Sequence, residues 1–149
     1  MNEKIILLIE DNPDDEELIR IALQENHIVS QLIVVHSGAE ALDYLFGTGT
    51  YTGRGLGRMP HLILLDLKLP KVHGLEVLRR LRADKRTTLL PVVILTSSNE
   101  EKDVLMSYSL GANSYIRKPV DFVQFTEAVR QLGLHWLVLN APPPRMPGA

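Results

Sequence analysis

Residues 5–13, which have the sequence IILLIEDNP, join five consecutive aliphatic residues to two acids, an asparagine and a proline. An aliphatic run without polar alternation is typical of a strand that is covered by helices on both faces. Asn12 is a good helix cap because its side chain can accept from free backbone amides, and Pro13 suits the first helical position. The stretch therefore predicts a buried strand that leads directly into a helix.

The same change from an apolar run to a helical pattern recurs along the chain. Short apolar runs predict four more strands, at residues 32–35, 62–65, 92–95 and 114–116. Five strands that alternate with helices predict an α/β fold, with a doubly wound parallel sheet and helices on both faces. In the first helix, the stripe expected to pack into the core is Leu18, Ile19, Ala22 and Leu23. The second helix is expected after the capping pair Ser37 and Glu40, with Ala41, Leu42, Leu45 and Phe46, and the third contains Leu75, Leu78 and Leu81. The fourth is expected over residues 99–110, ended by Gly111, and the fifth has the capping pair Asp121 and Gln124 with Phe122, Phe125, Val129, Leu132 and Trp136.

Composition limits the kind of protein. A chain of 149 residues with 45% hydrophobic and 23% charged residues suits one globular domain. Its lack of cysteine excludes a disulfide framework and a thiol nucleophile, and favours a cytoplasmic setting. The net charge of −2 argues against nucleic-acid binding, and the longest aliphatic run is too short to cross a membrane. We expect one domain over residues 1–140, a flexible proline-rich tail over 141–149, and a mobile glycine-rich segment at 47–59.

Polar residues follow the predicted strands at their carboxyl ends. Glu10 and Asp11 follow the first strand, Asp66 the third and Thr96 the fourth, and the fifth leads to Lys118. In an open parallel sheet these ends lie at one edge, where ligands bind. Three carboxylates, a hydroxyl group and an ammonium group are therefore predicted to meet in a single cleft.

This set of groups suits phosphoryl transfer. Three carboxylates in one cleft repel one another, and a hard cation such as Mg²⁺ or Mn²⁺ relieves that repulsion. With such an ion and Lys118 nearby, Asp66 is a candidate nucleophile, and Thr96 and Lys118 are candidates to bind the phosphoryl oxygens. The acids at residues 14–17 are interpreted only as favourable charges in the first turn of a helix.

Three other interpretations fit less well. A phosphatase of the haloacid dehalogenase type would have an acid two residues after its nucleophile, where this chain has Lys68. A dinucleotide-binding fold would have a glycine-rich loop after the first strand, where Glu10 and Asp11 would repel a phosphate. The five histidines show no pair at metal-ligand spacing on one helix.

Over residues 4–136 the chain resembles the receiver domain of two-component response regulators. The resemblance rests on the acidic pair Glu10 and Asp11, the sequence LDLKLP at 65–70 with Gly74 after it, Thr96 with Ser97, and Lys118 with Pro119. It implies a flavodoxin-like, five-stranded sheet in the order 2-1-3-4-5.

The resemblance also implies roles for individual residues. Asp66 would accept a phosphoryl group from a histidine kinase, so the chain would be a phosphoacceptor that assists its own phosphorylation and dephosphorylation rather than a conventional enzyme. Mg²⁺, or alternatively Mn²⁺, would be held by Glu10, Asp11, Asp66 and the backbone carbonyl of Lys68. Thr96 and Tyr115 would be switch residues, and a cis peptide bond before Pro119 would aim Lys118 into the site.

A narrower similarity is to small stand-alone regulators that serve cyanobacterial and bacterial phytochromes. Because the receiver pattern extends to about Trp136, we expect no output domain, and hence signalling by altered partner binding or dimerisation. The expected dimer face combines the fourth helix, the fifth strand, the fifth helix and the apolar residues 136–139. The alternative is a degenerate receiver that acts as a protein-interaction module without being phosphorylated.

Overall fold

The computed structural model describes residues 4–25, 31–53, 59–97, 101–118 and 122–131. They form one parallel sheet of five strands in the order β2-β1-β3-β4-β5, as predicted. The strands are β1 (Ile5–Ile9), β2 (Gln31–Val35), β3 (Leu62–Asp66), β4 (Val92–Thr96) and β5 (Ser114–Arg117).

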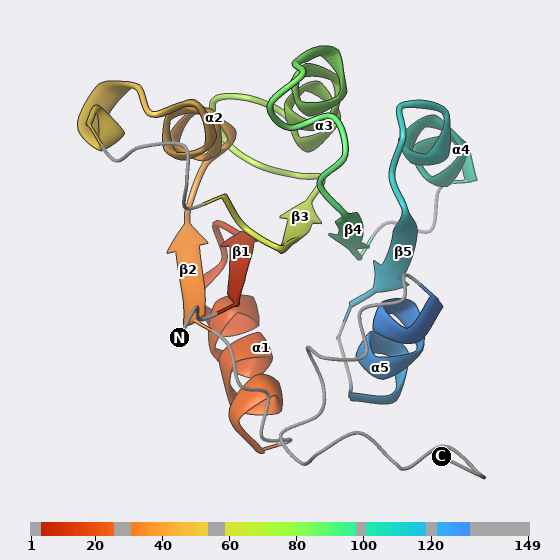
Figure 1. The fold of residues 1–149 in the computed structure, drawn as a ribbon. Helices are drawn as coiled ribbons and strands as arrows, with labels where there is room; N and C mark the ends of the chain where they lie inside the picture. The colour runs from red at the N-terminus through yellow and green to blue at the C-terminus, as the bar shows by residue number, and fades with distance from the viewer. Residues whose placement is uncertain (1–3, 26–30, 54–58, 98–100, 119–121, 132–149) are drawn as a thin grey trace, which may run out of the picture.

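Helices cover both faces of this sheet, with α2, α3 and α4 on one side and α1 and α5 on the other (Figure 1). None of the helices in the described ranges is long and apolar enough to cross a membrane. The doubly wound arrangement predicted from the alternation of strands and helices is confirmed. The helices are α1 (Pro13–Glu25), α2 (Gly38–Phe46), the short 3₁₀ helix η1 (Gly49–Tyr51), α3 (Gly74–Ala83), α4 (Glu101–Ser109) and α5 (Phe122–Gln131).

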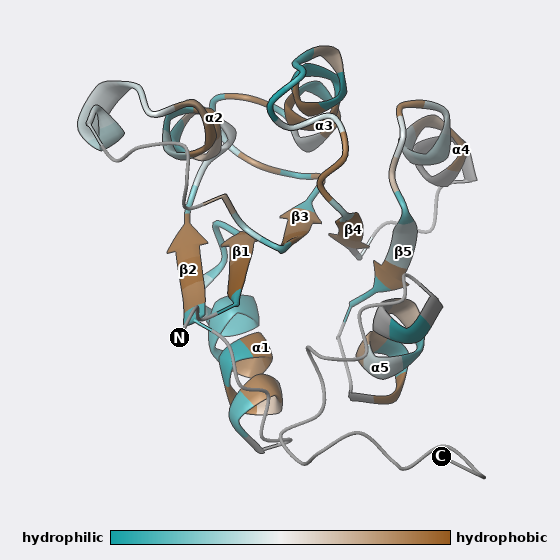
Figure 2. Ribbon diagram, in the orientation of Figure 1, coloured by the Kyte–Doolittle hydropathy of each residue, from teal (hydrophilic) through white to brown (hydrophobic). Residues whose placement is uncertain are grey.

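The uninterrupted apolar character of β1 follows from this layering. Leu7 and Ile9 belong to an apolar cluster shared with α2 and α3, whereas Ile6 and Leu8 belong to one shared with α1 and α5. Successive side chains of a strand point to opposite faces, so a strand between two helical layers needs apolar residues at every position. Strands β1 to β4 are accordingly mostly apolar (Figure 2), and β1 and β3 in the middle of the sheet are buried along their whole length.

The apolar face of α1 is narrower than the sequence predicts. Ile19 and Leu23 are buried against the sheet and Ala22 is half-buried, but the side chain of Leu18 is 52% exposed. The prediction that Leu18 belongs to the core is therefore wrong. Adjacent helical residues differ by about 100° in direction, so the contact of Ile19 with the sheet turns Leu18 toward solvent.

The segment after α2, where a mobile loop is expected, begins with regular local structure. Gly47 ends α2 in the left-handed conformation with a φ of 67°, and η1 follows. The hydroxyl group of Tyr51 donates to Glu40 at 2.8 Å, and its ring packs edge-on against Tyr44 with centroids 5.2 Å apart. Burial and the bond to Glu40 raise the pKa of Tyr51 to about 12. Residues 47–53 thus have a helix cap, a short helix and side-chain contacts that composition did not indicate, and residues 54–58 lie outside the described ranges.

Near the amino ends of β4 and β5, Arg82 of α3 connects its own helix to two other segments, the loop after α3 and the turn between α4 and β5. Its guanidinium group donates to the backbone oxygens of Gly111 at 3.0 Å, Thr88 at 3.1 Å and Leu90 at 2.8 Å, and to Oδ1 of Asn113 at 3.0 Å. These bonds hold the loop after α3 against the turn between α4 and β5. Gly111 has a φ of 101°, and a side chain there would press on Arg82.

Replacing this arginine tests its contribution to stability. Arg82→Met is expected to lower the free energy of unfolding by about 2–4 kcal/mol, because several part-buried carbonyl groups lose their donor together. The matched control is Arg80→Met, since Arg80 is exposed and, within the described residues, forms an ion pair with Glu76 on its own helix. Its effect should stay within about 0.5 kcal/mol. Urea unfolding measures both, and equal effects would contradict the structural role of Arg82.

Candidate functional site

The carboxyl ends of β1, β3 and β5 bring three predicted site residues together. Glu10 directly follows β1, Asp66 is the last residue of β3, and Lys118 directly follows β5. The Nζ atom of Lys118 lies 2.5 Å from Oε1 of Glu10 and 3.0 Å from Oδ2 of Asp66. The Lys118 side chain is only 10% exposed and both carboxylates are buried, so the pairing is shielded from water.

Asp11 completes a cluster of three carboxylates at this edge. Oxygen atoms of Glu10, Asp11 and Asp66 all lie within 4.8 Å of one another, and Asp11 alone of the three is exposed. An all-carboxylate set with one side open to water suits Mg²⁺ or Mn²⁺, which prefer oxygen ligands and retain several water molecules. The arrangement thus fits the predicted metal site.

The pKa values of Glu10 and Lys118 are both raised, but with different consequences for their charge. Burial and the neighbouring Asp66 carboxyl raise the pKa of Glu10 from 4.5 to about 7, although Lys118 partly offsets this. Burial alone would favour a neutral amine at Lys118, but Glu10, Asp15 and Asp66 outweigh it and raise the pKa of Lys118. The lysine therefore stays positively charged, whereas Glu10 exchanges its proton near neutral pH.

The raised pKa of Glu10 predicts a pH dependence of stability. Between about pH 4.5 and 7 the folded chain retains a proton on Glu10 that the unfolded chain has lost. Unfolding then releases a proton, so the free energy of unfolding falls as pH rises through this window. In metal-free buffer we expect the melting temperature of the wild type to fall by several degrees relative to Glu10→Gln. Parallel melting curves for the two proteins from pH 5 to 8 would contradict this assignment.

The loop after β3 explains why a glycine follows Asp66 at position 74. The backbone N–H of Lys68 donates to Oδ1 of Asp66 at 3.1 Å, and the N–H of Gly74 donates to the carbonyl of Leu67 at 2.9 Å. A Cβ atom at residue 74 would lie 2.4 Å from the carbonyl oxygen of Asp66. Only glycine allows α3 to begin this close to the strand that carries Asp66.

Asp15 joins the site although its sequence position indicated only a helix start. Its Oδ2 atom accepts a hydrogen bond from Nζ of Lys118 at 3.0 Å. Asn12 caps α1 by accepting from the N–H groups of Asp14 and Asp15 at 2.8 and 3.1 Å, which begins the helix at the edge of the sheet. The signal that could have identified it is its spacing, since Asp15 lies four residues before Ile19 and thus on the face that packs on the sheet.

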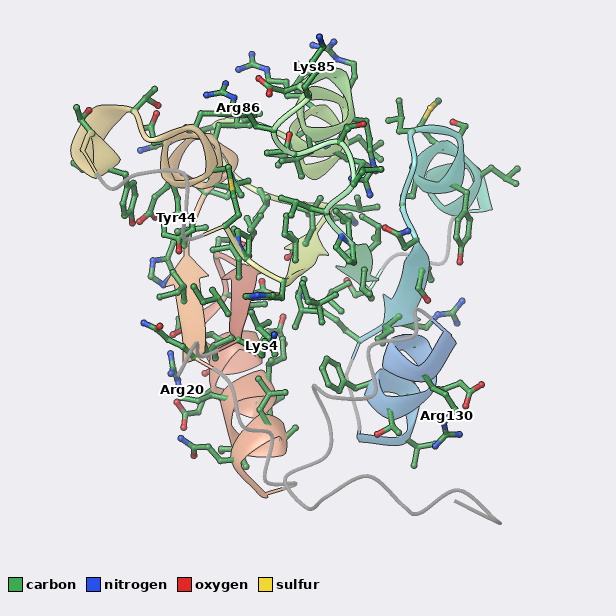
Figure 3. All side chains as sticks on the ribbon, in the orientation of Figure 1. Lys4, Arg20, Tyr44, Lys85, Arg86 and Arg130 are labelled. Atoms are coloured by element: carbon green, nitrogen blue, oxygen red, sulfur yellow. The ribbon has the colours of Figure 1, made fainter. Side chains whose placement is uncertain are left out.

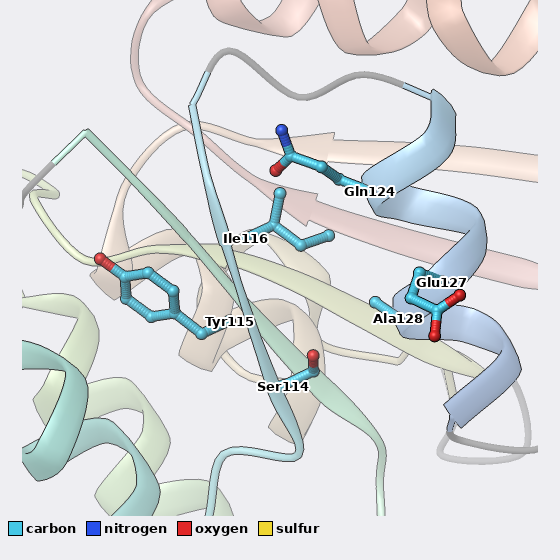
Figure 4. Close-up of a pocket in the computed structure, with 6 residues that line it drawn as sticks. All are labelled: Ser114, Tyr115, Ile116, Gln124, Glu127 and Ala128. Atoms are coloured by element: carbon cyan, nitrogen blue, oxygen red, sulfur yellow. The ribbon is translucent and has the colours of Figure 1, made fainter.

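The remaining predicted residues are only partly described. Thr96 ends β4 and is paired with Arg117 of β5, while its side chain lies outside the described part of the structure. Tyr115 is half-buried and packs with the cluster of α2 and α3. Its ring points away from α5 (Figure 4). Tyr115 nevertheless lines, with Ser114, Ile116 and residues of α5, a shallow hollow of about 230 Å³. Pro119, the region of Trp136 and residues 141–149 lie outside the described residues.

Known proteins are similar to this chain in both sequence and fold. Residues 6–130 match the family model described as the response regulator receiver domain. The response regulator Rcp1 of Synechocystis sp. is 37% identical over 134 residues, which cover 90% of this chain and 89% of Rcp1. Its structure in the Mn²⁺-bound form has a TM-score of 0.75 at 36% identity, over 94% of this chain and 99% of that one.

Two further solved structures are similar over nearly their whole length. The bacteriophytochrome response regulator AtBRR is 48% identical, with a TM-score of 0.84 over 95% of this chain and all of that chain. The phosphorylated cyanobacterial phytochrome response regulator RcpA is 37% identical, with a TM-score of 0.76 over 95% and 99% of the two chains. With the family model matched over most of its length, the chain belongs to the response regulator receiver domain family.

Proposed function

We propose that this response regulator accepts a phosphoryl group on Asp66 from the phosphohistidine of a sensor kinase. The observation that supports this most directly is the pairing of buried Lys118 with Asp66 at 3.0 Å, beside the cluster of Glu10, Asp11 and Asp66. A nucleophilic carboxylate, a fixed ammonium group and a metal-binding cluster are the parts that phosphoryl transfer needs.

In the proposed reaction an Oδ atom of Asp66 attacks the phosphorus atom. The bond between phosphorus and the histidine nitrogen breaks, and the nitrogen keeps the electron pair and takes up a proton from solvent. Lys118 pairs with one phosphoryl oxygen and the hydroxyl group of Thr96 donates to another. These contacts stabilise the negative charge that accumulates on the phosphoryl group.

A divalent cation would be held by Glu10, Asp11, Asp66 and the backbone carbonyl of Lys68. When bound, it would neutralise charge on the carboxylates and on the incoming phosphoryl group. The Mn²⁺-bound form of Rcp1 supports a divalent ion at such a site, and we propose Mg²⁺ as the usual ion. The exposure of Asp11 leaves that side of the cluster open to the phosphodonor.

For partners, we propose a kinase of the phytochrome type and a second copy of the chain. AtBRR and RcpA are both described as response regulators of phytochromes, which supports this choice of kinase. Phosphorylation would turn Tyr115 inward and change the face formed by α4, β5 and α5, and the signal would pass through altered dimerisation by that face and the Trp136 region. No nucleic acid or membrane is part of the proposal.

The test of the proposed function is the mass of the intact chain after incubation with acetyl phosphate and Mg²⁺. Gain of one phosphoryl group is expected, and removal of the ion by a chelator should abolish the gain. If the wild type gains no mass while it binds Mg²⁺, the proposal fails and the alternative of an interaction module without phosphorylation is favoured.

A further inference from the structure

Three carboxylates compete for one ammonium group in this site, and only two of them belong to the metal cluster. Nζ of Lys118 lies within 3.0 Å of oxygen atoms of Glu10, Asp15 and Asp66. Glu10 and Asp66 share the cluster with Asp11, whereas Asp15 lies outside it. Asp15 also differs in exposure, since its side chain is 31% exposed while that of Asp66 is 7% exposed.

This placement sets Lys118 against a divalent cation. The ammonium group pairs with Glu10 and Asp66, which are the two buried carboxylates that the cation would also bind. The ammonium group and the cation therefore compete for the same two ligands. Like charges repel strongly at such short range in a buried site. A cation enters more readily if the ammonium group can shift away without losing its counter-charge.

Asp15 offers that counter-charge from outside the metal cluster. It comes from α1, whereas Glu10 follows β1 and Asp66 ends β3, so the three acids approach the ammonium group from different elements. The bond of 3.0 Å already exists, and no rearrangement of α1 is needed for Lys118 to keep it. The capping bonds to Asn12 fix the first turn of α1 and hence the position of Asp15.

We propose that Asp15 is a positioning residue that holds Lys118 away from Glu10 and Asp66 when a divalent cation occupies the carboxylate cluster. The inference rests on the proposed function for its biological meaning, because the same lysine is then available to bind an incoming phosphoryl oxygen. Through Asp15, α1 would therefore help to set the affinity of the carboxylate cluster for a divalent cation.

The first experiment is calorimetric titration of the full chain with MgCl₂, for the wild type and for Asp15→Asn. The substitution removes the holding charge, so Lys118 remains on Glu10 and Asp66, and we expect Mg²⁺ affinity to fall about fivefold. The control is Asp14→Asn, which removes an equal charge from the adjacent, exposed position. Among the described residues, Lys118 pairs with Asp15 and not with Asp14. A fall of equal size in both variants would overturn the proposal, because it would reflect general charge alone.

A double-mutant cycle separates positioning from a merely structural effect. In the background of Lys118→Met there is no ammonium group to hold, so Asp15→Asn should change Mg²⁺ affinity by less than about twofold. An undiminished fivefold loss in that background would also overturn the proposal. Since metal binding is measured without a phosphodonor, failure of this inference is distinguishable from failure of Asp66 phosphorylation.

Discussion

Asp66→Asn is expected to abolish the gain of one phosphoryl group from acetyl phosphate while leaving the chain folded. The amide removes the negative charge and the nucleophilic oxygen, and no stronger nucleophile replaces them. The amide is close in size to the carboxylate, so it can retain the bond from the N–H of Lys68 that Oδ1 of Asp66 now accepts. The loss should therefore be chemical rather than structural.

Intact mass measures this result in the presence of Mg²⁺, with circular dichroism to confirm folding. Asp14→Asn is the matched control, since it changes an exposed aspartate on α1 and should still gain one phosphoryl group. A gain of mass in Asp66→Asn equal to that of the wild type would show that another residue is the acceptor.

Lys118→Met is expected to have the second largest effect, with opposite consequences for stability and metal binding. In metal-free buffer the substitution leaves the acids around Lys118 without their shared counter-charge. Breaking such a buried pair costs about 3 kcal/mol of unfolding free energy, and protonation of Glu10 limits the loss at low pH. Mg²⁺ should bind more tightly than in the wild type, because it no longer competes with the ammonium group.

Thermal unfolding with and without MgCl₂ tests both consequences. The increase in melting temperature caused by Mg²⁺ should be several degrees larger in Lys118→Met than in the wild type. Lys85→Met serves as the control, because Lys85 is exposed and follows the carboxyl end of α3, whereas α3 begins at Gly74 beside Asp66. Figure 3 shows the Lys85 side chain next to α3. An Mg²⁺-induced increase in Lys118→Met no larger than in the wild type would contradict the competition between the lysine and the cation.

Much of the fold could be predicted because its signals are local. Each signal depends on residues that are only a few positions apart in the sequence. Examples are the apolar run of β1, the helix cap at Asn12 and the left-handed glycine at position 111. The sequence also predicted that Glu10, Asp66 and Lys118 lie close together, because parallel strands align their carboxyl ends at one edge of the sheet whatever the details of side-chain packing.

Other features depended on contacts between distant residues. Tyr51 donates a hydrogen bond to Glu40 and packs on Tyr44, and neither contact could be read from the glycine-rich composition of the segment. Arg82 resembles its neighbours in a basic stretch, and only the fold makes it the donor to three carbonyl groups from two segments, the loop after α3 and the turn between α4 and β5.

The sequence by itself determined the alternation of strands and helices and the polar residues at the strand ends. Only the tertiary structure decided how α1 is rotated on the sheet. Its packing buries Ile19 and Leu23, which turns Leu18 to solvent and brings Asp15 to Lys118. Several rotations of an amphipathic helix satisfy the same local pattern, and the one adopted is set by side-chain packing against a sheet formed from distant parts of the chain.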